Sequence, residues 1–206
     1  MTTIAIKVQE KGVLEVAADS QLTQYTTCSM ISKYDRVSND CGKIHKQIYD
    51  IPVDEDTVKH FPIIFGHNGE ISDNYLIRDL FEPYYPLAEA IIKAVRDNSC
   101  PIRSICSQKL QDVGISDRIF DDSSFFIAYW SELQGEFIVG IGTIKHSRLI
   151  LRPITLLPGD FYAMGSGREF ALGAMQCGAT AATAVEVAKI YDIYTDGNVY
   201  VEKIEC

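Results

Sequence analysis

The sequence lacks the features that would assign it to a membrane-bound or nucleic-acid-binding class. No apolar run approaches the roughly 20 residues of a membrane-spanning helix, and the first residues do not follow the basic, apolar, small-residue order of a signal peptide. Positive charge is scarce, because 19 Lys and Arg stand against 28 Asp and Glu, for a net charge of -9. Nucleic-acid phosphates require a basic surface. We therefore expect a protein that binds neither membranes nor nucleic acids.

The motifs of several common enzyme classes are also missing. The six cysteines form no Cys-x-x-Cys pair and no two histidines stand four residues apart, so no zinc site, and no metal or cofactor, is expected. The sequence has no Gly-x-Ser-x-Gly, which is the motif of α/β serine hydrolases. Neither "GIG" nor "GSG" extends into a nucleotide-binding glycine motif. The scattered cysteines are typical of free thiols in a reducing compartment, which predicts a cytoplasmic protein.

The pattern that is present predicts one α+β domain over residues 1–206. Hydrophobic residues make up 47% of the chain and charged residues 23%, which suits a globular core. The polar stretch 20–42 is expected to be irregular, Gly178 to end a helix and Thr180 to cap the next. The order of strands, helices, strands, helices and strand favours layers over alternating βαβ units.

The predicted elements are bounded as follows. Strands are predicted over 2–8, 12–19, 43–51, 61–69, 123–130, 135–142, 147–154, 161–167 and 198–206. Helices are predicted over 71–81, 87–97, 99–114, 168–178 and 180–194.

The first residues could carry a nucleophile. Methionine aminopeptidases remove a start methionine before a small residue, so removal of Met1 would give Thr2 a free α-amine beside its hydroxyl. A threonine hydroxyl needs a base, and an α-amine, with a reference pKa of about 7.7–8.0, can be that base near neutral pH. The strand that starts directly afterwards would fix the position of Thr2.

Three separated motifs resemble one family. "TTIAIKV" and "GVLEVAADSQLT" look like the opening of proteasome β-type subunits and of the bacterial HslV peptidase, which are N-terminal-nucleophile hydrolases. "AMGSGREFALGAM" resembles the family's Gly-Ser-Gly turn with its following helix, and "AKIYDIYTDG" resembles its last helix end. The motifs occur in the family's order over nearly the whole chain. The resemblance is to a bacterial or phage proteasome-like subunit.

The resemblance implies a set of catalytic roles. Thr2 is the expected nucleophile, and Asp19 is expected to orient a lysine whose ammonium lowers the pKa of that nucleophile. Lys43 fits this lysine best, because the family has a lysine followed by an aliphatic residue at the start of this strand. Lys33 is the alternative, since it lies closer to Asp19 in sequence. Buried lysine and aspartate require each other as partners.

The second and third motifs imply a supporting network. Ser166 and Asp192 are expected to hold the α-amine and the attacking hydroxyl, with Thr195 in support. Ser166 could instead cap the helix that begins near Gly167. Asp192 is expected in the last turn of a helix, where the helix dipole disfavours a carboxylate, and this local cost indicates another reason for its presence.

The resemblance also implies where a substrate would bind. The backbone N–H of Gly69 is expected to form the oxyanion hole, since "GHNGEISD" stands where the family has a glycine-rich turn. Thr23 and the Gly69–Ile71 backbone are expected to line the substrate strand. His67 is expected near the primary specificity pocket.

For the whole protein, the resemblance implies a four-layer αββα sandwich of two mainly antiparallel sheets. The implied activity is that of a threonine endopeptidase acting on peptides or unfolded proteins inside a homo-oligomeric ring, with an ATP-dependent unfoldase as a candidate partner. Two alternatives stay open. One is a non-catalytic proteasome-like assembly subunit, and the other is a small-molecule amidohydrolase of the same nucleophile class.

Overall fold

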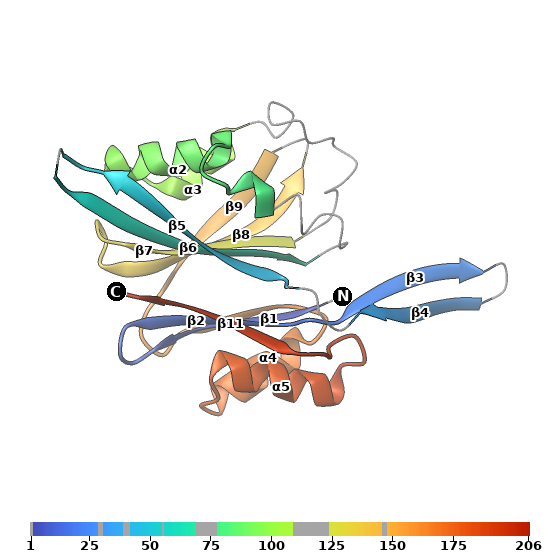
Figure 1. Cartoon of the computed structure of the whole chain (residues 1–206). Coiled ribbons are helices and arrows are strands. Elements are labelled where there is room, and N and C mark those ends of the chain that lie inside the picture. Colours follow the sequence, from blue (N-terminus) through green and yellow to red (C-terminus); the bar gives the residue numbers. More distant parts are fainter. Residues whose placement is uncertain are drawn as a thin grey trace. The chain divides into compact units, whose positions relative to one another are not determined.

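Figure 1 presents the computed structural model of the chain, which describes residues 2–28, 31–38, 42–54, 56–68, 78–108, 124–145 and 148–206. The chain divides into two compact units. The first consists of Met1–Ile44 and Pro158–Glu205, and the second of His45–Leu157 with Cys206. Among the described residues, each unit contains an antiparallel sheet of four or five strands and two of the labelled helices.

The first unit is built on a four-stranded sheet in the order β10-β1-β2-β11, with every neighbouring pair antiparallel. Its strands are β1 (Thr3–Gln9), β2 (Val13–Asp19), β10 (Phe161–Gly165) and β11 (Val199–Glu205). β1 and β2 form the predicted hairpin, whose turn contains Gly12 in a left-handed conformation at φ 73°. Because β1 pairs with β10 on one edge and with β2 on the other, the start of the chain is fixed within the sheet.

Two helices, α4 (Arg168–Gln176) and α5 (Ala181–Tyr191), cover one face of this sheet (Figure 1). The buried sheet residues beneath them are Ala5, Ala17 and Ala163, whose small side chains let the helices approach closely. The predicted helix boundary is confirmed. Gly178 follows α4 at φ 96°, and the Thr180 hydroxyl accepts a hydrogen bond from the N–H of Thr183 at 3.2 Å.

A second hairpin lies where the sequence predicted irregular structure. β3 (Leu22–Cys28) pairs antiparallel with β4 (Ile31–Ser38). The prediction was wrong because it relied on hydrophobic alternation, which reveals strands with one buried face. "LTQYTTC" and "ISKYDRVS" instead take their strand preference from threonine, tyrosine and β-branched residues set among polar ones.

The second unit has a five-stranded sheet in the order β5-β6-β7-β8-β9. The strands are β5 (Ile44–Pro52), β6 (Val58–Asn68), β7 (Ser124–Ser131), β8 (Glu136–Lys145) and β9 (Arg148–Leu156). Strands that are consecutive in sequence are neighbours in the sheet. The connection from β6 to β7 spans residues 69–123, whereas the other three connections are short. The five predicted strands of this region are confirmed.

Helices α2 (Pro86–Arg96) and α3 (Pro101–Ser107) pack on this sheet (Figure 1). Each begins with a proline, whose fixed φ suits the first helical position. Leu87 and Ile91 of α2 share one core with a row of rings in which Phe65 stacks on Phe81 at a centroid distance of 4.1 Å. The helix predicted over 99–114 ends at Ser107, and positions 109–114 lie outside the described residues, as do 71–77 of the helix predicted over 71–81.

Two observations limit what kinds of site the described residues contain. Within these residues, no helix combines the length and the apolar character needed to cross a bilayer. Over the same part of the chain, no three His, Cys, Asp or Glu side chains gather in a way that could bind a metal ion.

His67 predicts a pH dependence of stability. This residue in β6 is 3% exposed, and burial lowers its pKa to about 4. The unfolded chain, where the pKa is near 6.5, then binds more protons between pH 4 and 6.5, so stability falls as pH drops through this window. We expect the free energy of unfolding of wild type to be about 2 kcal/mol higher at pH 7 than at pH 5 from this group.

The measurement is urea denaturation at both pH values for wild type, His67→Gln and His60→Gln. His67→Gln should lose most of the difference between the two pH values. His60 is the matched control, because its side chain is 72% exposed, and His60→Gln should keep the difference. An unchanged pH dependence in His67→Gln would contradict this assignment.

Candidate active site

Thr2 and Thr3, at the start of β1, are buried next to the end of β10. Thr2 is 3% exposed and Thr3 is fully buried. Thr3 stands opposite Gly165 in the β1–β10 register, and the N–H of Ser166 donates to the Thr2 carbonyl oxygen at 2.8 Å. The backbone of Thr2 is therefore held by the "GSG" turn at residues 165–167.

Asp19 and Lys43 form a buried ion pair beside these residues. Lys43 Nζ donates to Asp19 Oδ2 at 2.8 Å, and the exposed fractions of the two side chains are 8% and 0%. The same carboxylate accepts the N–H of Thr3 at 2.7 Å and that of Gln21 at 3.1 Å. Burial raises the pKa of Asp19, while the Lys43 ammonium and the two backbone donors offset part of that rise. Lys33, the alternative partner, has its backbone opposite Thr26 in the β3–β4 hairpin.

Asp192 is the centre of a second polar cluster. Its Oδ2 accepts hydrogen bonds from Ser166 Oγ at 2.6 Å and from Thr195 Oγ1 at 2.6 Å. Its Oδ1 accepts the N–H of Tyr194 at 3.2 Å. Asp192 was predicted in the last turn of the helix. It lies instead directly after α5, in extended conformation at φ -105°, and there its carboxylate accepts these hydrogen bonds.

Thr3 joins the two clusters, and no role was expected for it. Its N–H donates to Asp19, its hydroxyl lies 2.6 Å from that of Thr195, and the N–H of Gly167 donates to its Oγ1 at 3.1 Å. The sequence signal was the second threonine of "TTIAIKV". Its alternation identified a strand position but gave no reason for a hydroxyl at a fully buried site.

Two glycines make the close approach possible. Gly165 has φ 98°, and a Cβ built there would lie 1.7 Å from the Thr2 carbonyl oxygen. A Cβ on Gly167 would lie 2.2 Å from Thr3 Oγ1 and 3.1 Å from Asp192 Oδ2. "GSG" is therefore a packing requirement, since a side chain at either position would displace the threonines or the carboxylate.

The expected substrate-binding residues fall elsewhere in the chain. His67 lies in β6 of the second unit, buried and mostly neutral at pH 7 because burial lowers its pKa to about 4. Thr23 lies in β3, with its backbone opposite Arg36 next to a register shift. Gly69, Ile71 and Met1 lie outside the described residues. The structure thus brings together Thr2, Asp19, Lys43, Ser166, Asp192 and Thr195, all within the first unit.

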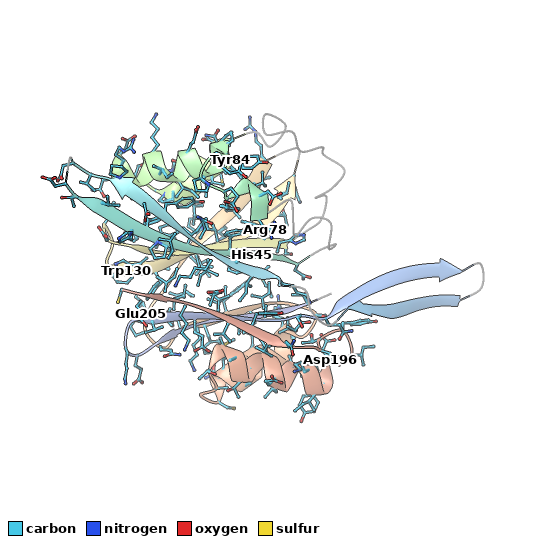
Figure 2. The ribbon with its side chains drawn as sticks, viewed as in Figure 1. His45, Arg78, Tyr84, Trp130, Asp196 and Glu205 are labelled. Carbon is cyan, nitrogen blue, oxygen red and sulfur yellow. The ribbon has the colours of Figure 1, made fainter. Side chains whose placement is uncertain are left out.

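Figure 2 shows the side chains around this unit, with Asp196 labelled in the turn that follows the site. Asp196 Oδ1 accepts the N–H of Gly197 at 2.7 Å, and Gly197 has φ 84°. The N–H of Asn198 donates to Ser20 Oγ at 2.8 Å. This turn therefore leads the chain from Thr195 into β11, next to the end of β2.

Comparison with known proteins identifies similar folds but no family with a similar sequence. No protein-family model matches the chain, and no curated protein matches its sequence. Among solved structures, Thiobacillus denitrificans BPH in complex with epoxomicin matches with a TM-score of 0.54 at 18% identity, over 98% of both chains. A second structure of Thiobacillus denitrificans BPH matches with a TM-score of 0.50 at 16% identity, over 98% of this chain and 97% of that one.

Anbu, the ancestral beta-subunit from Yersinia bercovieri, matches with a TM-score of 0.51 at 11% identity, over 98% of this chain and 81% of that one. BPH is a bacterial proteasome homologue. The fold is proteasome-like. In this proteasome-like fold, the buried Asp19–Lys43 pair and the Asp192 cluster both contact Thr3, the first residue of β1.

The packing of Gly167 gives a test of the site's geometry. We expect Gly167→Ala to lower the free energy of unfolding by about 2 kcal/mol, because the added methyl group meets Thr3 Oγ1 inside a closed hydrogen-bond network. Gly173→Ala, in the exposed part of α4, is the matched control, since a Cβ there meets nothing within 4 Å. It should raise stability by up to about 1 kcal/mol. Chemical denaturation measures both, and equal stability of the two variants would contradict the close contact.

Proposed function

We propose that this chain is a subunit of a threonine peptidase that hydrolyses peptide bonds through Thr2 after removal of Met1. The proposal includes the complete four-layer αββα arrangement, with residues 1–206 acting as one domain. The observation that carries it is the position of Thr2. Its backbone is bound by Ser166, and the next residue touches both a buried Asp–Lys pair and a carboxylate cluster.

The buried charges support a nucleophile more readily than a purely structural role. Replacing a buried ion pair by apolar side chains is often neutral or stabilising, so such a pair is weak evidence for stability. An ammonium held next to a hydroxyl favours the deprotonated form of that hydroxyl. In the proposal, Asp19 fixes Lys43, and Lys43 provides the positive charge for Thr2.

The proposed reaction needs no metal or cofactor. The Thr2 hydroxyl gives its proton to the α-amine of the same residue while its Oγ1 forms a bond to the peptide carbonyl carbon. The C–N bond then breaks, and the leaving amine takes that proton. Water attacks the resulting ester, returns a proton to Thr2 Oγ1 and leaves with the acyl group as a carboxylic acid. Asp192, with the hydroxyls of Ser166 and Thr195, would orient the amine.

The substrate contacts remain part of the proposal. The N–H of Gly69 would stabilise the oxyanion, Thr23 and the backbone of Ile71 would line the substrate strand, and His67 would lie near the specificity pocket. A neutral imidazole, which the lowered pKa of His67 favours at pH 7, would suit an uncharged substrate side chain.

Assembly into a homo-oligomeric ring is proposed on the proteasome-like fold and on one surface feature. Four large apolar side chains are exposed at the end of α5 and the facing start of α4: Phe170, Ile190, Tyr191 and Ile193. Two of them, Phe170 and Tyr191, stack at a centroid distance of 5.4 Å. A group of exposed apolar residues is typical of an interaction surface. In the proposal the ring is cytoplasmic, encloses unfolded-protein or peptide substrates, and could receive them from an ATP-dependent unfoldase.

Two other functions fit parts of the same observations. A non-catalytic assembly subunit would keep the fold, and retention of Met1 would favour it, because the α-amine would then belong to Met1 and Thr2 would lack its base. A small-molecule amidohydrolase would use the same residues without a ring, and native mass spectrometry would then find a monomer or dimer.

The decisive experiment combines intact mass with a covalent probe. We expect the purified protein to lack Met1 and to gain one molecule of epoxomicin at Thr2. Epoxomicin is the compound present in the Thiobacillus denitrificans BPH complex. Thr2→Ala, also without Met1, should bind none and hydrolyse no peptide, because the reacting hydroxyl is gone. Thr183→Ala, on the exposed side of α5, is the control and should react like wild type. Retention of Met1, or full activity of Thr2→Ala, would refute the proposal.

The Asp19–Lys43 pair gives a second test. Lys43→Met alone leaves a buried carboxylate unpaired and should lower the free energy of unfolding by about 3–5 kcal/mol. The double variant Asp19→Asn, Lys43→Met removes both charges, so we expect it to fold and yet to lose about 100-fold or more in peptidase rate.

Lys59→Met is the control for the Lys43 change, because Lys59 pairs with Glu132 on an exposed surface of the second unit. Surface pairs of this kind contribute little, so stability and rate should stay near wild type. A folded double variant with the wild-type rate would show that the pair has no part in the reaction.

A further inference from the structure

We propose that Thr3 is a positioning residue of this site, whose hydroxyl aligns the Asp192 cluster with the Asp19–Lys43 pair. The inference rests on the proposed function, since it assigns to Thr3 the alignment of the groups that would act on Thr2. Thr3 itself touches no substrate in this proposal. It acts through the turn at Ser166 and Gly167 and through Thr195.

The direction of every hydrogen bond in this network follows from simple counting. An ionised carboxylate only accepts, and a hydroxyl has one hydrogen. Thr195 therefore gives its hydrogen to Asp192 Oδ2 at 2.6 Å. Thr3 then donates to Thr195 at 2.6 Å, and its remaining lone pair accepts the N–H of Gly167 at 3.1 Å. A one-way chain runs from the Gly167 amide through two hydroxyls to the carboxylate.

The backbone of the same residue ties this chain to the lysine. The N–H of Thr3 donates to Asp19 Oδ1, while Lys43 binds the other oxygen of the same carboxylate. Thr3 is fully buried, so solvent cannot replace these bonds. One residue thus sets the distance between the positive charge and the Asp192 cluster.

A hydroxyl is the group that this position requires. Serine would keep the hydroxyl and lose a methyl group, whereas valine would keep the volume and lose the hydroxyl. Without the hydroxyl, the buried N–H of Gly167 loses its acceptor. Since Ser166 precedes Gly167 and holds the Thr2 carbonyl, movement of the turn would displace Thr2. Misplacement of a reacting group by about 1 Å can cost about 100-fold in rate.

The test compares Thr3→Val with Thr3→Ser for the reaction of Thr2 with epoxomicin. In Thr3→Val we expect the maximal rate of covalent labelling to fall 10- to 100-fold, with the half-saturating concentration within about 3-fold of wild type. In Thr3→Ser, labelling should stay within about 3-fold of wild type, because the hydroxyl is retained. Wild-type labelling in folded Thr3→Val would overturn the inference and leave Thr3 a purely structural residue.

A second readout does not depend on activity. Hydrogen exchange of the Gly167 amide, followed by NMR, should be at least about 10-fold faster in Thr3→Val than in wild type or Thr3→Ser. The Ala184 amide, which donates to the Thr180 carbonyl at 2.9 Å in α5, is the internal control for general loss of stability. Equal acceleration at both amides would contradict a local role.

The two readouts separate failure of this inference from failure of the proposed function. If wild type is not labelled at Thr2, the peptidase proposal fails, and the exchange experiment alone decides whether Thr3 holds the turn. If Thr3→Val does not fold, Thr195→Val removes the acceptor of the Thr3 hydrogen and keeps the bond from Gly167. It should then slow labelling 10- to 100-fold without faster exchange at Gly167, and wild-type labelling would overturn the inference.

Discussion

A buried carboxylate at the end of β2 imposes the constraint on which the rest of the first unit depends. Asp19 is fully buried, and an ionised carboxylate removed from water is costly unless donors surround it. The donors are the N–H of Thr3, the N–H of Gln21 and the ammonium of Lys43. They come from three separate places in the chain. Satisfying Asp19 therefore requires β1 to lie next to β2 and the chain to return to this point before β5.

Hydrogen bonds also connect the β1–β2 hairpin to the start of α5. Glu15 of β2 is 3% exposed and accepts the N–H of Ala182 in the first turn of α5 at 3.0 Å. Lys7, opposite Glu15 in the β1–β2 register, donates to the Ala179 carbonyl at 2.6 Å. The sheet thus holds the start of α5, and Asp192 follows its end. Because α5 is rigid, fixing one end to the hairpin places the carboxylate at the other end beside the "GSG" turn.

Much of this arrangement could be predicted from residue patterns. Alternation located β1, and short apolar stretches next to turn residues located β2 and the five strands of the second unit. Gly178 and Thr180 located the boundary between α4 and α5 through local backbone chemistry. The β3–β4 hairpin was missed because its residues carry strand preference without hydrophobic alternation. The role of Thr3 was missed because a hydroxyl in a strand becomes informative only when its partners, far apart in sequence, are known.

The sequence by itself determined most of the strands, the boundary between α4 and α5, and the candidate residues at both ends of the chain. It left both Lys33 and Lys43 as candidate partners of Asp19, because separation along the chain does not determine distance in space. Only the tertiary structure placed Lys43 beside Asp19, and only it brought Ser166, Asp192 and Thr195 to the same place. The physical reason is that local patterns fix how each segment folds. Which segments meet is decided by the pairing of β1 with β10 and by the need to satisfy buried polar groups.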